Sequence, residues 1–252
     1  MTFLEFFSTL LGSAMLILVL VSSAWGQDTA SKIARANDLY LNRNYTEAAA
    51  LYEELIQKDF HNGYLYYNLG NAYMRQGKTG PAILNYLRAE TWIPRDENLD
   101  ANLRFALQKT EDNLYLKTGG WLKTLIFWVD DLNASEHLKL LLGANFLFFS
   151  SLIGWTLRRS DSWNLVRKIL LLLLILTAAG TGIKFYTQDR DLQGVILAKQ
   201  VDVKSGQGES NVTLFQLHEG AVVKIRREQN GWVEIEIPGD PKGWVPREKI
   251  GI

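Results

Sequence analysis

Two long apolar runs dominate the pattern of hydrophobic and polar positions in this chain. They cover residues 138–157 and 169–186, and helices of that length span roughly 25 to 30 Å, the thickness of the hydrocarbon core of a bilayer. The pattern predicts a transmembrane hairpin. An even number of spans places the residues before and after the hairpin on the same side of the membrane.

The loop between the runs and the N-terminus predict the orientation of the hairpin. Residues 158–168 hold four basic side chains and one acid, which favours the cytoplasmic side. Residues 1–26 contain an apolar run followed by Ala24 and Gly26, the pattern of a secretory signal peptide. An uncleaved anchor is the alternative, because the first residues include Glu5 and no Lys or Arg. Both alternatives export the chain that follows.

The composition of the two apolar runs predicts that the hairpin serves as a membrane anchor. The two apolar runs contain no Asp, Glu, Arg or His, and such residues usually mark an ion or substrate path through a membrane. Ser150 with Gly154, and Ala178 with Gly182, are pairs of small residues that let helices approach closely. These pairs pack within the hairpin or receive helices of other proteins, and the sequence leaves both alternatives open.

Apolar positions recur at helical spacing between residues 30 and 113, and the spacing itself repeats. A unit beginning at Gly63 resembles a tetratricopeptide repeat, and an earlier, weaker unit lies about 34 residues before it. The stretch Glu97 to Lys109 is expected to cover the second unit as a capping helix. The residues at signature positions are Tyr66, Leu69, Gly70, Tyr73, Gly77, Ala82, Tyr86, Ala89 and Pro94, then Ala36, Leu39, Tyr45, Ala48 and Tyr52 in the weaker unit.

The resemblance to tetratricopeptide repeats implies a groove that binds a partner protein. In this family the first helix of each repeat lines a concave surface that receives a peptide. Asn37 and Asn71 match the asparagines of the carboxylate-clamp subfamily, but the basic clamp positions hold Ile33, Ala101 and Phe105, so a charged peptide tail is not expected. Packing between the repeats is the alternative role. The groove residues implied here are Asn37, Tyr40, Tyr64, Tyr67, Asn71, Met74 and Phe105.

Residues 114–137 connect the repeats to the hairpin. Their apolar part is too short to span a membrane and carries Trp121 and Trp128, which favours a helix lying on the bilayer surface. A helix buried against the repeats is the alternative. Asn133, followed three residues later by Glu136, predicts a capping box at the start of the first membrane helix.

Residues 192–252 change to an alternating apolar pattern in short segments separated by Gly, Asn and Pro, which predicts a small β-barrel. Asn230 and Gly231 are typical of a two-residue hairpin turn. The segment resembles a bacterial SH3-like domain, and such domains bind peptides or cell-wall material. The candidate ligand face is Phe215, Trp232 and Trp244, with core packing as the alternative role of the tryptophans.

Composition excludes several classes of function. The 252 residues carry 27 basic and 27 acidic side chains, so no charge excess attracts nucleic acid. The absence of cysteine excludes disulfides, thiolate nucleophiles and cysteine metal sites. The three histidines are far apart in the sequence, and no motif joins a nucleophile, a base and an orienting group. We therefore expect no enzyme activity, no cofactor and no metal.

The order of the segments resembles the BatE family of the bacterial aerotolerance (Bat) operons. The sequence thus predicts a multidomain protein with an all-α tetratricopeptide-repeat solenoid, a two-helix transmembrane hairpin and a small SH3-like β-barrel. The resemblance implies partnership with von Willebrand factor A-type Bat proteins and a large Bat membrane protein, beside a MoxR-type ATPase. We expect a non-catalytic scaffold in the bacterial cytoplasmic (inner) membrane, with both soluble domains in the periplasm. A cell-envelope sensor whose SH3-like domain binds peptidoglycan is the alternative.

Overall fold

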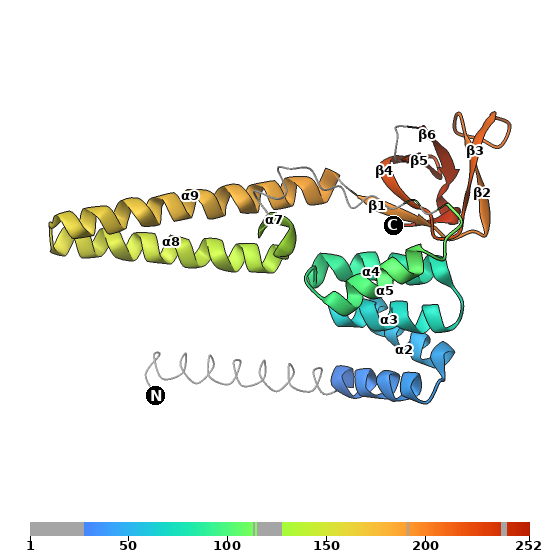
Figure 1. The fold of residues 1–252 in the computed structure, drawn as a ribbon, viewed down its shortest axis with the longest axis horizontal. Helices are drawn as coiled ribbons and strands as arrows, with labels where there is room; N and C mark the ends of the chain where they lie inside the picture. Colours follow the sequence, from blue (N-terminus) through green and yellow to red (C-terminus); the bar gives the residue numbers. More distant parts are fainter. Residues whose placement is uncertain (1–27, 113, 115–127, 191, 238–240) are drawn as a thin grey trace, which may run out of the picture.

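The computed structural model describes residues 28–112, 114, 128–190, 192–237 and 241–252. The predicted signal peptide over residues 1–26 lies outside the described residues, and so does most of the predicted interfacial helix. A group of helices, a long helical hairpin and a β-sheet follow one another along the chain (Figure 1). The helical group and the sheet lie at one end of the hairpin.

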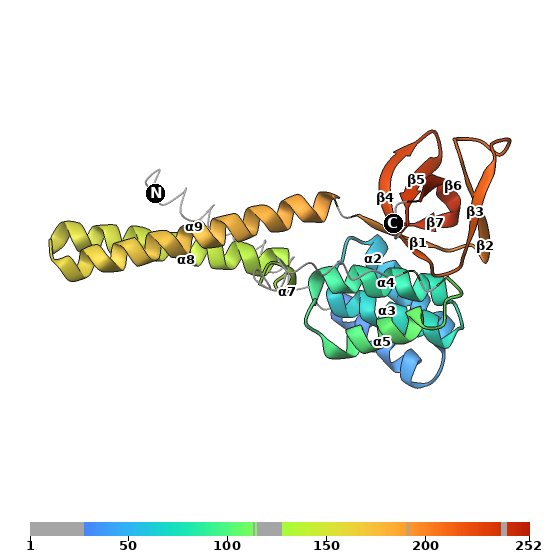
Figure 2. The same cartoon turned by 45° about the horizontal axis from the view of Figure 1, so that its top comes forward.

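The helical group begins with a helix over residues 28–41. It continues with α2 (Tyr45–Gln57), α3 (Gly63–Arg75), α4 (Thr79–Trp92) and α5 (Glu97–Leu107), which pack side by side (Figure 2). Side chains cap two of these helices: Asn62 accepts a hydrogen bond from Tyr64 N, and Asp96 accepts one from Leu99 N. α4 ends two residues before Pro94, as the sequence predicts.

The interior of this group contains most of the residues that the repeat pattern singled out, whereas Gly77 is exposed in the turn after α3. A Cβ atom on Gly70 would lie 2.6 Å from the ring of Tyr86, so the glycine lets α3 and α4 approach closely. α5 covers the adjacent core with four buried side chains: Leu99, Leu103, Ala106 and Leu107. Phe105, which the amphipathic pattern grouped with them, lies outside this core.

Two long apolar helices form the hairpin, α8 (Ala134–Leu157, 24 residues) and α9 (Asp161–Arg190, 30 residues). Both are long and apolar enough to cross a membrane. The predicted loop over residues 158–168 is wrong from Asp161 onward, because α9 already begins there and includes Arg167 and Lys168. An apolar run marks only the part of a helix that suits lipid, whereas the backbone hydrogen bonds continue through polar residues.

Contacts at both ends of the hairpin settle how it packs. The predicted capping box is confirmed: Asn133 Oδ1 accepts from Glu136 N, and Glu136 Oε2 accepts from Asn133 N, both at 2.9 Å. A Cβ on Gly154 would lie 2.7 Å from the ring of Trp163, so Gly154 serves contact within the hairpin. No described atom lies within 4 Å of the corresponding position on Gly182.

The short helix α7 (Trp128–Asp131) is the described part of the predicted interfacial segment. It packs against α9, where the indole nitrogen of Trp128 would be 3.1 Å from a Cβ placed on Gly180. The ring nitrogen Nε2 of buried His137 lies 3.3 Å from the carbonyl oxygen of Val129. α7 thus belongs to the hairpin.

The C-terminal part is a seven-stranded antiparallel sheet with the order β3-β2-β6-β5-β4-β1-β7. Asn230 and Gly231 both have positive φ, 52° and 74°, which confirms the predicted turn between β4 and β5. The strands are β1 (Gln193–Ile196), β2 (Gln200–Lys204), β3 (Thr213–His218), β4 (Val222–Gln229), β5 (Trp232–Glu236), β6 (Lys242–Pro246) and β7 (Ile250–Gly251), with a 3-10 turn at Arg247–Lys249.

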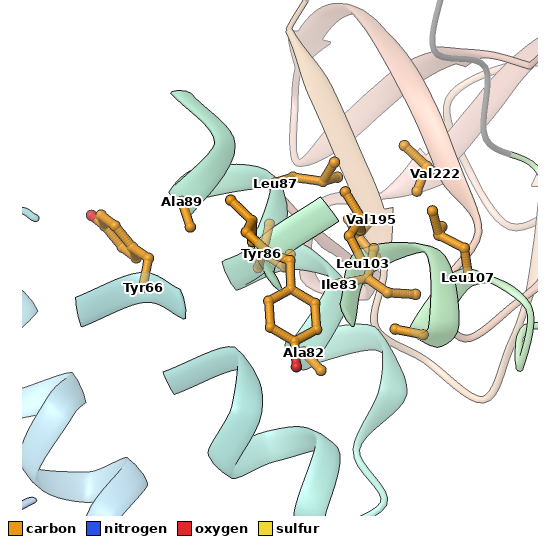
Figure 3. Packing of buried hydrophobic residues seen from close by; sticks show 13 residues of the cluster. Tyr66, Ala82, Ile83, Tyr86, Leu87, Ala89, Leu103, Leu107, Val195 and Val222 are labelled. Carbon is orange, nitrogen blue, oxygen red and sulfur yellow. The ribbon is translucent and has the colours of Figure 1, made fainter. Parts of the chain in front are cut away.

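The helical group and the sheet share a hydrophobic core. Val195 and Val222 of the sheet are buried in one cluster with Ile83 of α4 and with Leu103 and Leu107 of α5 (Figure 3). Hydrogen bonds surround this core: Gly80 N donates to Glu219 Oε1 at 2.8 Å, and Arg88 Nη2 donates to the carbonyl oxygen of Ile252 at 2.6 Å. The two parts form one packed unit, although nothing in the sequence pattern indicated that they touch.

We predict that Gly220→Ala lowers the stability of this contact more than Gly77→Ala does. Both glycines have positive φ, 89° and 76°, but a Cβ on Gly220 would lie 2.5 Å from Thr110 whereas no described atom approaches Gly77. Overpacking at Gly220 is expected to cost about 1 to 3 kcal/mol beyond the backbone strain. Denaturant unfolding of the two variants measures the difference, and equal losses would contradict the close approach.

Candidate functional site

A network of hydrogen bonds repeats along the helical group. Tyr52 Oη donates to Asn37 Oδ1 at 2.6 Å, and Tyr86 Oη donates to Asn71 Oδ1 at 2.8 Å, each between residues 15 positions apart. The same oxygens accept from the side chains of the next helix pair, Asn68 Nδ2 at 3.3 Å and Asn102 Nδ2 at 2.9 Å, each 31 positions away. One structural unit therefore occurs twice, with a period of about 34 residues.

Burial makes this network obligatory. Tyr52 and Tyr86 are 1% exposed, and burial raises the pKa of Tyr52 to about 12 and that of Tyr86 still further. Both hydroxyls stay protonated and must donate, because a buried donor without an acceptor is costly. The carbonyl oxygens of Asn37 and Asn71 supply this need, so these two asparagines hold neighbouring helices together. No described residue accepts a hydrogen bond from their Nδ2 atoms.

The structure brings four of the predicted groove residues together. Tyr67, Asn71 and Met74 follow one another along one face of α3 at helical spacing, and Tyr67 Oη accepts from Asn102 Nδ2 at 3.0 Å. Phe105 follows Asn102 by one turn of α5 and is 52% exposed, with Lys109 Nζ lying 4.6 Å from its ring centroid. Three of the predicted groove residues lie elsewhere on the helical group.

These three residues are Asn37, which accepts from Tyr52 in the first unit, Tyr40 and Tyr64. Tyr40 packs edge-on against Tyr45 with ring centroids 5.3 Å apart, next to Asn37 in the first unit. Tyr64 lies at the start of α3 and lines a different cleft with Trp92 and the first turn of α8. The groove face in the second unit therefore consists of Tyr67, Asn71, Met74 and Phe105.

The sheet leaves this groove face open. Its contacts with the helical group involve α4, the end of α5 and the chain after α5, through Gly80, Ile83, Leu84, Arg88, Leu107, Thr110 and Asp112. None of the seven predicted groove residues is among them. The sheet instead adds Val195 and Val222 to the core beneath α4 and α5.

We predict that Asn71→Ala destabilises the protein by about 1 to 3 kcal/mol, because it removes the acceptor of the buried Tyr86 hydroxyl. Adding Tyr86→Phe is expected to recover part of the loss, since the unpaired hydroxyl is then absent. Thermal unfolding of the wild type, both single variants and the double variant measures this coupling. If the losses of stability in the two single variants simply add up in the double variant, the two side chains are not coupled by a hydrogen bond.

Phe215, Trp232 and Trp244 were predicted to form one ligand face on the sheet. This prediction is wrong, because the three side chains do not lie on the same face. Trp232 pairs with Pro246, and Trp244 pairs with Glu234 and Lys204, so both tryptophans lie on one face. Phe215 pairs with buried Val203 and packs against the core on the other face. The alternation of side chains along β3 decides its side.

The two tryptophans also differ from each other. Trp244 is 7% exposed, and the guanidinium of Arg227 lies 5.0 Å from its ring centroid, which leaves little of the ring for a ligand. Trp232 is half-buried. Packing thus accounts for Trp244, the alternative that the sequence left open.

A hollow of about 330 Å³ lies elsewhere on the sheet, lined by Gln200, Val201, Asp202, Glu209, Pro246 and Lys249. Asp202 accepts hydrogen bonds from Gln216, Lys204 and Thr213. The bonds from Gln216 and Lys204 hold the pKa of the Asp202 carboxyl below its ordinary value. The sequence analysis missed this site, because its residues come from strands that become neighbours only in the folded sheet.

A second hollow, of about 290 Å³, lies where the helical group meets the hairpin. Arg95 Nη2 donates to Glu136 Oε1 at 2.5 Å, and Asn133 Nδ2 donates to the carbonyl oxygen of Trp92 at 2.9 Å. Tyr64, Trp92 and Arg95 line it together with both residues of the capping box. Of these, sequence reasoning identified Tyr64 for another role and missed Trp92 and Arg95.

One ionisable contact joins the helical group to the sheet. Asp112 accepts from His218 N at 2.6 Å, and its other carboxylate oxygen lies 3.0 Å from His218 Nδ1. The hydrogen bond with Asp112 raises the pKa of the His218 imidazole above its ordinary value of 6.5. A raised pKa in the folded state stabilises the fold below that ordinary value, and the contribution is lost as the pH rises through the raised pKa.

We predict that the wild type becomes less stable between about pH 6 and about pH 8 relative to His218→Gln, which keeps the main-chain bond to Asp112 but cannot titrate. The thermal midpoints of both proteins across this range measure the effect. Parallel curves would show that the imidazole does not contribute to the contact.

In the part of the chain that the structure describes, no three His, Cys, Asp or Glu side chains are grouped so that they could hold a metal ion. A comparison of the sequence with known protein families finds no match, and neither does a search of curated proteins. The assignment of a function therefore rests on the residues and their geometry.

Proposed function

We propose that this protein is a non-catalytic scaffold, anchored in the bacterial cytoplasmic membrane, whose tetratricopeptide-type groove binds a segment of a partner protein. One observation carries the proposal. Phe105 is exposed, and Tyr67, Asn71 and Met74 are only partly buried, while the sheet packs against α4 and the end of α5. A partner could bind to the groove without displacing the β domain.

The repeat assignment is supported by the hydrogen-bond network. Asparagine, tyrosine and asparagine recur at equivalent positions with a period of about 34 residues, the length of a tetratricopeptide repeat. Two units are close to the minimum for a stable solenoid. α5 and the β domain, which we assign as SH3-like, add the apolar surface that would otherwise come from a third repeat.

The topology is supported by the packing of the two soluble parts. The helical group precedes the hairpin and the β domain follows it, yet they share one core, which requires that both lie on the same side of the membrane. The tip of the hairpin carries Arg159 and Arg167, whose guanidinium groups lie 6.0 and 4.3 Å from the ring centroid of Trp155. A basic, tryptophan-bearing tip suits the cytoplasmic interface, which supports a periplasmic position for the soluble parts.

The chemistry of the groove favours an uncharged, extended segment as the ligand. Tyr67 and Phe105 offer ring surface, and the Nδ2 atom of Asn71 offers a donor for a main-chain carbonyl. The resemblance to the BatE family suggests that the segment comes from a von Willebrand factor A-type Bat protein or the large Bat membrane protein.

A peptidoglycan sensor is the second candidate, and the hollow around Asp202 favours it. That hollow offers a carboxylate, Gln200 and Lys249 to a polar ligand, and the β domain contacts α4 directly. The effect of a ligand bound in this hollow would thus be transmitted to the groove only through the hydrophobic core that the β domain shares with the helical group.

We predict that Phe105→Ser reduces recovery of partner proteins from detergent-solubilised membranes by about tenfold, as expected for an aromatic residue that anchors an interface. Leu41→Ser is the matched control, because Leu41 is 78% exposed and is not one of the predicted groove residues. Both variants should unfold at the wild-type temperature, since neither side chain is buried.

Mass spectrometry of the recovered proteins identifies the partner. Equal recovery with Phe105→Ser and Leu41→Ser would exclude the groove. If sedimentation of the full-length protein with purified cell wall then depended on Asp202, the sensor would replace the scaffold.

A further inference from the structure

The hollow between the helical group and the hairpin lies at the depth of lipid headgroups. Glu136 precedes Leu138, the first residue of the apolar run, by about 3 Å of helix rise. The headgroup layer of each leaflet is about 5 to 7 Å thick. A cleft lined by Asn133 and Glu136 therefore opens within this layer when α8 spans the membrane.

The helical group is held in this position by its own contacts with α8. Asn133 Nδ2 donates to the main-chain oxygen of Trp92, and Arg95 pairs with Glu136. Figure 1 shows the end of α4 turned toward the hairpin. The turn between α4 and α5 consequently lies at the outer surface of the bilayer.

The exposed side chains of the cleft suit this environment. Trp92 is 45% exposed and Tyr64 is also exposed, although each has a large ring. Tryptophan and tyrosine are enriched at membrane interfaces, where the ring contacts the acyl boundary and the polar atom contacts water. If the helical group were surrounded only by water, the rings of Trp92 and Tyr64 would have no apolar environment to contact.

The charges of the cleft indicate the class of headgroup. Arg95, Glu136 and Asp96 all line it, and the Arg95 guanidinium has five donors, of which the pairing with Glu136 uses one. The remaining donors match a phosphate. The carboxylates and the face of the Trp92 ring match an ammonium group.

We propose that this cleft binds the headgroup of a zwitterionic phospholipid in the outer leaflet, with Arg95 at the phosphate and Trp92 and the carboxylates at the ammonium group. The inference rests on the membrane anchoring in the proposed function and is independent of the groove. Binding there fixes the height of the repeats above the membrane and hence the distance at which they meet a partner.

The position of the cleft in the headgroup layer is tested by fluorescence quenching in the full-length protein. The chain has no cysteine, so Thr91→Cys, Phe146→Cys and Ser210→Cys each accept one fluorophore. Thr91 adjoins Trp92, Phe146 is an exposed residue in the middle of α8, and Ser210 is exposed in the loop between β2 and β3. In phosphatidylethanolamine nanodiscs, headgroup spin labels should quench at Thr91 and acyl-chain labels at Phe146, with no quenching at Ser210.

The lipid class is tested by native mass spectrometry of the protein released from nanodiscs with equal phosphatidylethanolamine and phosphatidylglycerol. The wild type should retain phosphatidylethanolamine preferentially, and Trp92→Ala should reduce that retention by about fivefold. Trp92→Ala keeps the main-chain oxygen that Asn133 contacts. Leu41→Ala is the control and should retain the wild-type amount.

The negative results of these two experiments can be distinguished from one another. Quenching at Phe146 without quenching at Thr91 would overturn the headgroup site and leave the anchoring intact. The absence of quenching at Phe146 would overturn both. Equal retention of the two lipids, or retention unaffected by Trp92→Ala, would overturn the assignment of a zwitterionic ligand to this cleft.

Discussion

The contact of α4 with the β domain is the interaction on which the rest of this structure depends. It joins segments separated by the whole hairpin, through Ile83 against Val195 and Val222 and through the hydrogen bond from Gly80 to Glu219. Because apolar surface stabilises only where it leaves water, the helical group gains stability from the apolar surface that it buries against the sheet. The same contact requires that the segments before and after the hairpin lie side by side.

A second constraint acts inside the helical group. The buried hydroxyls of Tyr52 and Tyr86 need acceptors, and Asn37 and Asn71 provide them. Residues that a repeat pattern assigns to ligand binding therefore also hold the helices together. Their carbonyl oxygens are used internally while their amide nitrogens find no described acceptor, so one side chain can serve stability and recognition through different atoms.

The hairpin positions the helical group through polar contacts at its first turn. The capping box of Asn133 and Glu136 organises the start of α8, and the same two side chains reach Trp92 and Arg95 of the repeats. A helix cap normally satisfies only its own backbone. Here it also holds the end of α4 and the residues after it against the first turn of α8.

Local pattern in the sequence determined the elements: the helices from apolar spacing, the end of α4 before Pro94, the capping box, and the turn at Asn230 and Gly231. Each depends on residues close together in the chain, where side-chain spacing and backbone preference act directly. The tertiary structure alone decided that Phe215 and Trp244 lie on opposite faces and that Tyr64 joins Trp92 and Glu136. Those outcomes depend on which distant segments become neighbours, and the burial shared between such segments leaves no periodic signal in either one.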